Sequence, residues 1–298
     1  MKREKQLAYV SLGLVSIIWG TTYVAARIGA QQMPGFFVAG VRQFLSGLVV
    51  VVYFLARGYK LPDWPVIRQL SVQGILLLCI ANGLITWSME YISGGLAAII
   101  VALVPLFVAF FTARLCRNKQ ITRWMVVGWI TGFAGIVVIF YDYLGALHNT
   151  RFILGVVLAF ISVLSWSYGT VYAARNRPAV DILFSAGLQM LIAGVVMLLI
   201  CVFTGQYVFL GNASKDAWLA LLYLVVFGSL IAYSAYAFAL SKLPATQVSL
   251  YAYINPIVAV GLGWAMLSEE MNLQMGMGAL ITLTGVYLVN HEIKKQQQ

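Results

Sequence analysis

The sequence predicts an all-α integral membrane protein with ten transmembrane helices in two inverted five-helix repeats. Three observations lead to this fold class. Of the 298 residues, 62% are hydrophobic and only 9% are charged, whereas a soluble domain has roughly 25% charged residues. Apolar runs near the length of about 20 residues that crosses a bilayer recur along the whole chain. The two halves of the chain also resemble each other at a spacing near 150 residues.

The apolar runs place the ten spans in order along the chain. The first run follows a basic segment but is longer than the signal-peptide core of about 7–15 residues, so we expect it to remain as a helix. Short loops separate each run from the next. We expect helices at residues 7–28, 36–56, 70–89, 94–115, 124–141, 152–174, 182–203, 217–240, 245–267 and 272–290.

The distribution of Lys and Arg predicts the orientation. With the N-terminus in the cytoplasm, cytoplasmic segments contain 15 of the 19 basic residues, and the other side contains only Arg27, Arg151 and Lys215. This asymmetry follows the positive-inside rule and predicts that both termini are cytoplasmic in a multi-pass protein of the cell inner membrane. The net charge of +10 is explained by this topology, so we expect no nucleic-acid partner.

The internal repeat divides the chain into residues 1–145 and 146–298. Segment 37–49 aligns with segment 184–196, and further pairs follow in the same order: Pro105 with Pro256, Gly128 with Gly278, and Gly135 with Gly285. Because each half has five spans, an odd number, the second half must enter the membrane from the opposite side. Inverted repeats of this kind are typical of secondary transporters, with a binding site near the membrane midplane.

The two prolines interrupt corresponding spans at equal depth. Pro105 and Pro256 cannot bond to the carbonyls of Val101 and Ala252, four residues earlier. Paired interruptions in the two halves indicate the binding site of a transporter. We therefore predict that both prolines act as hinges, and that the neighbouring Asn255 contacts substrate.

Several motifs resemble the drug/metabolite transporter superfamily and, within it, the EamA branch. They are Trp19-Gly20-Thr21, an Arg in the second span (Arg42), and a late run with Glu269, Gly278, Ala279, Leu280, Ile281 and Gly285. The resemblance covers nearly the whole chain and implies a ten-helix permease for small metabolites. It departs from the family pattern at Lys119, where the first repeat would have a Glu. Glu269 is therefore interpreted as a helix cap or tether, since Glu favours helix N-termini.

Two charged residues are candidates for function. Arg42 lies inside a span, where its guanidinium could anchor a substrate carboxylate or phosphate; alternatively it snorkels to the interface as a structural residue. Its repeat partner is the neutral Gln189. Glu90 closes the third span and is the candidate for proton coupling, since no Asp or Glu lies at a span centre.

Polar residues at helical spacing predict two stripes that rise from opposite sides to the membrane centre. Such stripes suit an alternating-access cavity, although hydrogen bonds between helices would produce the same spacing. The third span carries Asn82, Thr86 and Glu90, and the ninth carries Gln247, Tyr251 and Asn255.

Deep aromatic residues add to the candidate site. Trp19 and Trp166 lie mid-span at repeat-equivalent positions, and Tyr233 and Tyr236 lie within the eighth span. A mid-span Trp needs a partner for its indole N–H, which favours a cavity wall or a packed interface over lipid.

These features predict a secondary transporter, favouring export, of small metabolites such as amino acids or related organic solutes. No Walker A motif is present, and we expect neither an enzyme nor a cofactor or metal. A membrane-embedded transferase and a membrane scaffold are the alternatives. We expect the lipid bilayer and a small molecule as partners, and a monomer or weak homodimer. The predicted substrate-binding residues are Trp19, Arg42, Asn82, Thr86, Glu90, Trp166, Gln189, Tyr233, Tyr236, Gln247, Tyr251 and Asn255.

Overall fold

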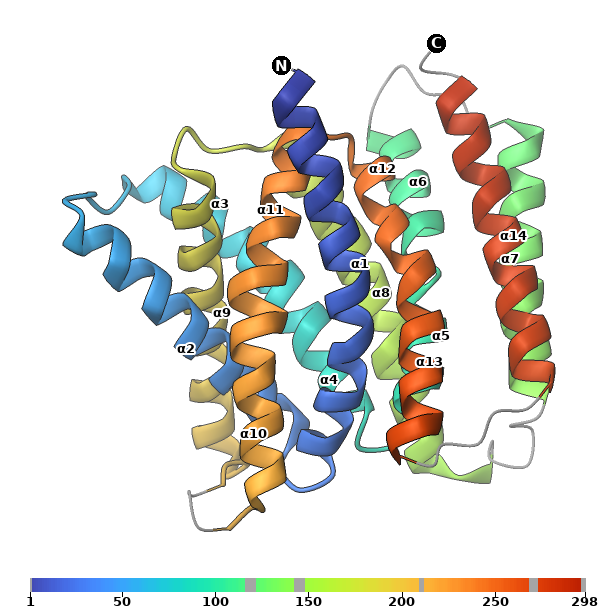
Figure 1. Cartoon of the computed structure of the whole chain (residues 1–298), viewed down its shortest axis with the longest axis horizontal. Helices are drawn as coiled ribbons and strands as arrows, with labels where there is room; N and C mark the ends of the chain where they lie inside the picture. Colours follow the sequence, from blue (N-terminus) through green and yellow to red (C-terminus); the bar gives the residue numbers. More distant parts are fainter. Residues whose placement is uncertain (1, 116–121, 142–147, 209–211, 268–272, 296–298) are drawn as a thin grey trace.

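The computed structural model describes residues 2–115, 122–141, 148–208, 212–267 and 273–295. Within these ranges the chain forms a bundle of helices and no strand. Helix α1 begins and α14 ends at the same end of the bundle (Figure 1), which we call the terminal end, and the opposite end is the far end. Lys119 and Glu269 lie outside the described residues.

The helices follow the predicted spans closely, since each apolar run satisfies its backbone hydrogen bonds internally. In the first half they are α1 (Lys2–Ala30), α2 (Gly35–Ala56), α3 (Trp64–Gly74), η1 (Ile75–Asn82), α4 (Gly83–Ser88), α5 (Gly94–Val101), α6 (Val104–Leu115) and α7 (Arg123–Tyr141). In the second half they are α8 (Thr150–Arg175), α9 (Ile182–Thr204), α10 (Lys215–Tyr223), η3 (Leu224–Ile231), α11 (Ala232–Lys242), α12 (Ala245–Val248), η4 (Ser249–Tyr253), α13 (Ile254–Leu267) and α14 (Leu273–Lys295).

Eight segments of the described chain are long and apolar enough to cross a membrane. Several of them join consecutive helices, because α3, η1 and α4 form one continuous rod, as do α10, η3 and α11. Helices α7 and α14 are two further helices that stand side by side at one edge of the bundle (Figure 1). The described chain therefore supports eight spans, and the predicted total of ten is not confirmed.

Four of these rods change helix type or bend midway. The third and eighth predicted spans pass through π-helical turns, η1 and η3. The fourth breaks between α5 and α6, just before Pro105, and the ninth contains the 3-10 segment η4 before Pro256. The breaks lie two or three residues before each proline, because a proline is tolerated in the first turn of a new helix but not in the interior of a continuous one.

Two pairs of helices pack at backbone distance through glycines. A Cβ on Gly47 of α2 would overlap the backbone of Leu191 in α9, and a Cβ on Gly194 of α9 would overlap the backbone of Phe44. The α7–α14 pair meets in the same way, through Gly128, Gly135, Gly278 and Gly285. Small residues that let backbones approach are typical of helix pairs in membranes, where dispersion contacts stabilise association.

Candidate functional site

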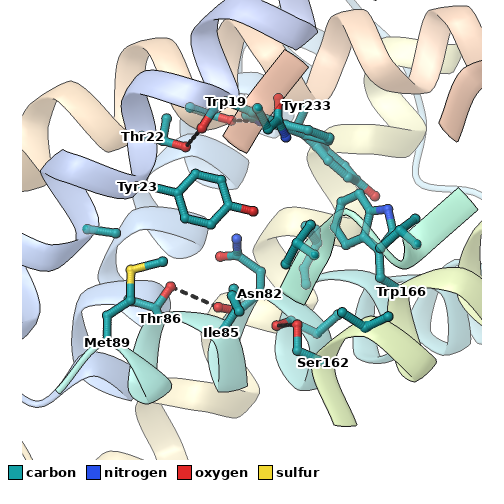
Figure 2. Close-up of a pocket in the computed structure, with 18 of the residues that line it drawn as sticks. Trp19, Thr22, Tyr23, Asn82, Ile85, Thr86, Met89, Ser162, Trp166 and Tyr233 are labelled. Atoms are coloured by element: carbon teal, nitrogen blue, oxygen red, sulfur yellow. Dashed lines mark hydrogen bonds between the residues drawn. The ribbon is translucent and has the colours of Figure 1, made fainter. Parts of the chain in front are cut away.

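A cavity lies among the helices of the bundle (Figure 2). We call it the central cavity. It reaches Met89, which follows the end of α4 at the far end, so it extends from mid-bundle toward that side. The lining residues are Trp19, Thr22, Tyr23, Ala26, Arg42, Gln43, Leu78, Ala81, Asn82, Ile85, Thr86, Met89, Val101, Val104, Ser162, Val163, Trp166, Gly228, Tyr233, Tyr251 and Asn255.

The irregular turns of the rods supply much of this lining. Asn82 is the last residue of η1, Gly228 lies in η3, and Tyr251 lies in η4. Val101, whose carbonyl loses a partner at Pro105, also faces the cavity. Irregular backbone is tolerated at membrane depth where it lines a cavity or is buried in protein. The helix breaks and the cavity therefore occur together for a physical reason.

Arg42 points into the protein, which contradicts the snorkelling alternative. Its side chain is 5% exposed, and its Nε donates to the Ser229 hydroxyl at 2.8 Å. The Ser229 hydroxyl donates in turn to Gln43 Oε1 at 3.4 Å, and Gln43 Nε2 donates to Asn82 Oδ1 at 3.1 Å. Arg42 thus begins a polar chain that runs from α2 through η3 to η1 along the wall of the cavity.

An aromatic layer closes the central cavity toward the terminal end. Trp19 lies 5.3 Å from Trp166, 5.3 Å from Tyr236 and 4.9 Å from Tyr251, measured between ring centroids. The rings of Trp166 and Tyr236 are 5.2 Å apart. We call these four residues the aromatic partition. Its edge-to-face and tilted contacts are those that aromatic quadrupoles favour.

A second cavity lies beyond the partition, at the terminal end. We call it the terminal cavity. Tyr233 borders both cavities, and Tyr236 belongs to the partition and also borders this second one. The Tyr233 hydroxyl donates to Gln189 Oε1, and Gln189 Nε2 donates to Gln73 Oε1 at 2.6 Å. Tyr233 is therefore the residue that the two cavities share, and it stacks on Tyr236 of the partition with ring centroids 5.9 Å apart.

Asn255 is buried and holds two helices together at the cavity wall. With its amide oriented so that the nitrogen faces two carbonyls, Nδ2 lies 2.9 Å from the Ser16 oxygen and 3.3 Å from the Tyr251 oxygen. The other side of the amide faces the Tyr23 hydroxyl. Asn255 thus ties α13 to α1, and it also lines the central cavity.

The structure brings together eight of the twelve predicted substrate-binding residues at the central cavity. They are Trp19, Arg42, Asn82, Thr86, Trp166, Tyr233, Tyr251 and Asn255. Gln189 and Tyr236 border the terminal cavity instead. Gln247 borders neither cavity and accepts a hydrogen bond from Tyr9 at 3.1 Å. The predicted stripe fails at Gln247, because the 3-10 turn η4 changes the helical periodicity before Tyr251.

Glu90 also lies outside the central cavity, contrary to the predicted stripe. It follows the end of α4, and its carboxylate accepts a hydrogen bond from the backbone N–H of Gly35, the first residue of α2. Burial raises the pKa of Glu90 above its ordinary value, and the Gly35 bond opposes that shift in part. A carboxylate at this position accepts a hydrogen bond from an otherwise unpaired N–H of α2. Its negative charge also interacts favourably with the positive end of the helix dipole.

Four cavity residues with polar side chains were not singled out from the sequence: Thr22, Tyr23, Gln43 and Ser162. Their spacing would have found three of them. Tyr23 follows Trp19 by four residues, Thr22 follows it by three, and Ser162 precedes Trp166 by four, so each pair shares one helix face. Gln43 had no such signal, because a residue adjacent to Arg42 normally faces another direction.

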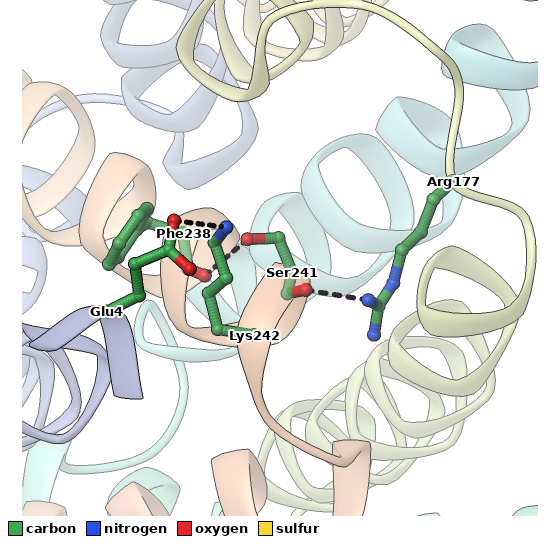
Figure 3. Close-up of polar contacts among 5 residues, drawn as sticks. All are labelled: Glu4, Arg177, Phe238, Ser241 and Lys242. Atoms are coloured by element: carbon green, nitrogen blue, oxygen red, sulfur yellow. Dashed lines mark hydrogen bonds and ion pairs between the residues drawn. The ribbon is translucent and has the colours of Figure 1, made fainter. Parts of the chain in front are cut away.

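Polar contacts join three elements at the terminal end, beside the terminal cavity (Figure 3). Arg177 donates to the carbonyls of Ser241 at 2.6 Å and Leu240 at 3.0 Å, at the C-terminus of α11. Lys242 forms an ion pair with Glu4 of α1 at 3.1 Å. We call these contacts the terminal clasp. They join α11 to α1 and to the segment after α8.

The described chain contains no group of three or more His, Cys, Asp or Glu residues placed to hold a metal ion. The chemistry of the central cavity is instead that of a binding site, with one cation, several amides and hydroxyls, and aromatic walls. An apolar pocket with a few convergent polar groups is the usual form of a small-molecule site.

Comparisons with known proteins agree with a membrane transporter. The model of the EamA-like transporter family matches residues 6–141 and 153–291. The inner membrane transporter YedA of Escherichia coli is 34% identical over 86% of this chain and 81% of its own length. The transporter YvbV of Bacillus subtilis is 28% identical over 96% of this chain and 92% of its own length. These relatives are named as transporters and not as enzymes.

A solved crystal structure shares the fold. It superposes with a TM-score of 0.70 at 20% sequence identity, covering 96% of this chain and 97% of the other. The family resemblance inferred from the Trp19, Arg42 and late glycine motifs is confirmed by the family match across both halves.

Proposed function

This chain belongs to the EamA-like transporter family, and from that premise we propose that it exports small organic metabolites by alternating access. The observation that carries the proposal is the pair of cavities separated by the aromatic partition. In the proposed cycle this conformation presents the solute site toward the far end, the side on which the central cavity reaches Met89, and the aromatic rings lie on the terminal side of that site. Transport would require the partition and the terminal clasp to open while the far end closes.

We propose that the ten-helix count and the inverted repeat both hold, with residues 1–145 and 146–298 as the two halves. Reciprocal contacts support this. Gly47 meets Leu191 and Gly194 meets Phe44, which are the same contact seen from each half, since both pairs of equivalents differ by 147 (194 − 47 and 191 − 44). The π-helical turns η1 and η3 also begin 149 residues apart (224 − 75). Helices α7 and α14 would be the fifth and tenth spans.

We propose that the terminal end faces the cytoplasm of a cell inner membrane. The excess of Lys and Arg in the loops and tails of that end supports this orientation. The relative YedA is described as an inner membrane transporter. With this orientation the central cavity extends toward the outside, the side on which an exporter releases its solute.

We propose that Pro105 and Pro256 act as hinges in the change between the two states. Each begins a new helical rod directly after a break that borders the central cavity. A broken rod can change its angle at lower cost than a continuous helix, because the hydrogen bonds at the break are already missing. The transport unit would be the monomer, since one chain supplies the whole cavity; a weak homodimer would leave that unit unchanged.

We propose that Glu90 couples protons to transport indirectly. Glu90 holds the first N–H of α2, and α2 carries Arg42. Protonation would weaken this contact and release the far end of α2, so that a proton could favour one state without contacting the solute. Transport by Glu90→Gln proteoliposomes that still responds fully to an imposed pH gradient would remove this role.

Cysteine labelling tests the proposed function. In a variant without Cys79, Cys116 and Cys201, a single cysteine at Asn82 should react with a membrane-impermeant maleimide from the far side. A single cysteine at Ser185, which borders the terminal cavity, should react from the terminal side only. Transported solute should change both rates in opposite directions. Unchanged rates at both positions with every solute of a metabolite panel, or no reaction at Asn82→Cys from either side, would contradict alternating access.

A further inference from the structure

We propose that the solute of the central cavity is an organic anion, and that its carboxylate pairs with Arg42. The proposal deepens the proposed transport function and rests on it. It assigns a charge class to the solute, which distinguishes it from a zwitterion, a neutral molecule or an organic cation.

The charge balance of the cavity carries the first step. Arg42 is the one charged residue among its lining residues, which include no Asp, Glu, Lys or His. The side chain is 5% exposed, and no carboxylate of the described chain forms an ion pair with it. A buried guanidinium without a counter-ion is costly, because burial removes its hydration and the one hydrogen bond to Ser229 leaves its charge uncompensated. A solute anion would supply the missing charge.

The hydrogen-bonding groups give the second step. Within the described part of the chain, Arg42 has a hydrogen-bond partner for Nε only, the Ser229 hydroxyl. Its two terminal nitrogens are therefore available as donors. Gly228 leaves room for them, because a Cβ there would lie 2.7 Å from Arg42 Nη2. The Ser229 contact fixes the guanidinium plane, and a fixed planar fork suits two-point binding of a carboxylate.

Asn82 adds a further donor to the same wall. Its Oδ1 accepts the Gln43 amide at 3.1 Å, so its own Nδ2 remains for a ligand, and the side chain lies among those that face the cavity (Figure 2). By contrast, the hydroxyls of Thr22, Thr86 and Ser162 each donate to a backbone carbonyl at 2.7 or 2.8 Å. The polar wall therefore offers free N–H donors, as an anion requires.

The rest of the wall determines the body of the solute. The rings of Trp19, Tyr23, Trp166, Tyr233 and Tyr251 and several aliphatic side chains face the same space. They favour a compact apolar or aromatic group. A zwitterion or an amine would place an ammonium in this space with no carboxylate among the lining residues to pair with it, and only ring faces to attract it. An organic acid satisfies Arg42 and leaves no charge unpaired.

A series of probes with one ring and different charges tests the proposal on the whole protein in lipid nanodiscs. The probes are phenylacetate, phenylacetamide, 2-phenylethylamine and phenylalanine, measured by calorimetric titration. We expect phenylacetate to bind at least about tenfold more tightly than each of the others, a difference of about 1.4 kcal/mol. Equal affinity for the acid and its amide, tighter binding of the amine or of phenylalanine, or no binding of phenylacetate at millimolar concentration would overturn it.

Variants test whether the preference for acid over amide depends on Arg42. Arg42→Gln should remove the preference for acid over amide, and Arg42→Lys should retain part of it. Arg57→Gln, which removes the same charge from an exposed position, should leave it intact. The wild-type series decides the charge class even if Arg42→Gln does not fold. If the cysteine labelling described above succeeds and the acid preference is absent, only the solute class is overturned; if the labelling fails, the transport proposal itself is overturned.

Discussion

Trp19 and Trp166 meet edge to face, with ring centroids 5.3 Å apart and planes inclined at 83°. The two residues lie at equivalent positions of the proposed repeats, 147 apart (166 − 19). Trp19 donates its indole N–H to the Gly228 carbonyl at 3.0 Å, whereas the Trp166 indole N–H is buried without a well-aligned partner in the described chain. One indole is therefore held by a backbone carbonyl of η3, and the other is held by ring packing and a poorly aligned contact with the Tyr251 hydroxyl.

This difference predicts that Trp166 is the movable part of the aromatic partition. Trp166→Ala should open a path between the two cavities, so that a cysteine at Ser185 reacts with an impermeant maleimide added on the far side. Trp166→Phe, which retains a ring, should keep the barrier. Trp264→Ala removes an indole that is 63% exposed and serves as a control. No far-side labelling in Trp166→Ala would show that other side chains form the barrier.

The close approach of α2 and α9 predicts a strong effect of small substitutions. Gly47→Ala places a Cβ against the Leu191 backbone, which cannot move without shifting α9. Overpacking of this kind costs about 1–3 kcal/mol, so the midpoint of thermal unfolding in detergent should fall. Gly13→Ala meets no atom within 4 Å and should leave the midpoint unchanged or raise it, because Ala favours a helix more than Gly does. Equal effects of the two variants would contradict the packing argument.

The contacts of Asn255 predict that it has a structural role as well as a place in the cavity. Asn255→Val removes the donor to the Ser16 and Tyr251 carbonyls and should cost about 1–3 kcal/mol, the usual penalty for unsatisfied buried groups. Asn255→Gln keeps the amide but adds a methylene, and it should reduce transport more than stability. Thermal midpoints and uptake by proteoliposomes separate the two effects. Full stability in Asn255→Val would exclude the tie between α13 and α1.

The terminal clasp predicts a shift in the conformational equilibrium. Arg177→Ala removes two hydrogen bonds to the C-terminal carbonyls of α11, and the terminal end should then open more often. A cysteine at Ser185 should react faster from the terminal side, and one at Asn82 should react more slowly from the far side. Lys295→Ala breaks an exposed ion pair with Glu292 and is the matched control. A change at only one of the two positions would argue against coupled opening.

Glu90 predicts a pH dependence of stability with a definite sign. Burial raises its pKa in the folded protein, so between the ordinary value of about 4.3 and the raised value the folded state binds more protons than the unfolded state. Stability should therefore fall as the pH rises through that window. Thermal midpoints measured across this range should decline less steeply in Glu90→Gln than in the wild type. If the thermal midpoints of the two proteins declined equally with pH, another titrating group would cause the pH dependence.

The helical segments and their order were predictable from the sequence, because bilayer length and hydrophobicity constrain each run independently of its neighbours. The prolines also indicated which rods are broken. The positions of the breaks were harder to predict from the sequence. The 3-10 turn at Ser249–Tyr253 removed Gln247 from the stripe that contains Tyr251 and Asn255, and no sequence signal specified that turn.

The site residues that could be predicted are those whose polar or charged side chains are costly to bury in a membrane. Arg42, Asn82 and Asn255 stand out because each needs a polar partner at that depth, and all three line the central cavity. Glu90 stood out for the same reason, yet it caps α2. A helical stripe predicts which residues share a face, but the end of α4 at Ser88 turns the chain before Glu90.

The sequence by itself determined the membrane setting, the helical segments, the family and eight of the residues that line the central cavity, because each follows from hydropathy, periodicity or motif. Only the tertiary structure decided that Arg42 faces Ser229 of a distant helix, that the aromatic partition separates two cavities, and that Gln43 joins Asn82. These relationships join residues between 39 and 232 positions apart in the chain (82 − 43 and 251 − 19). They depend on how the rods pack at their glycines and bend at their breaks, which local sequence does not specify.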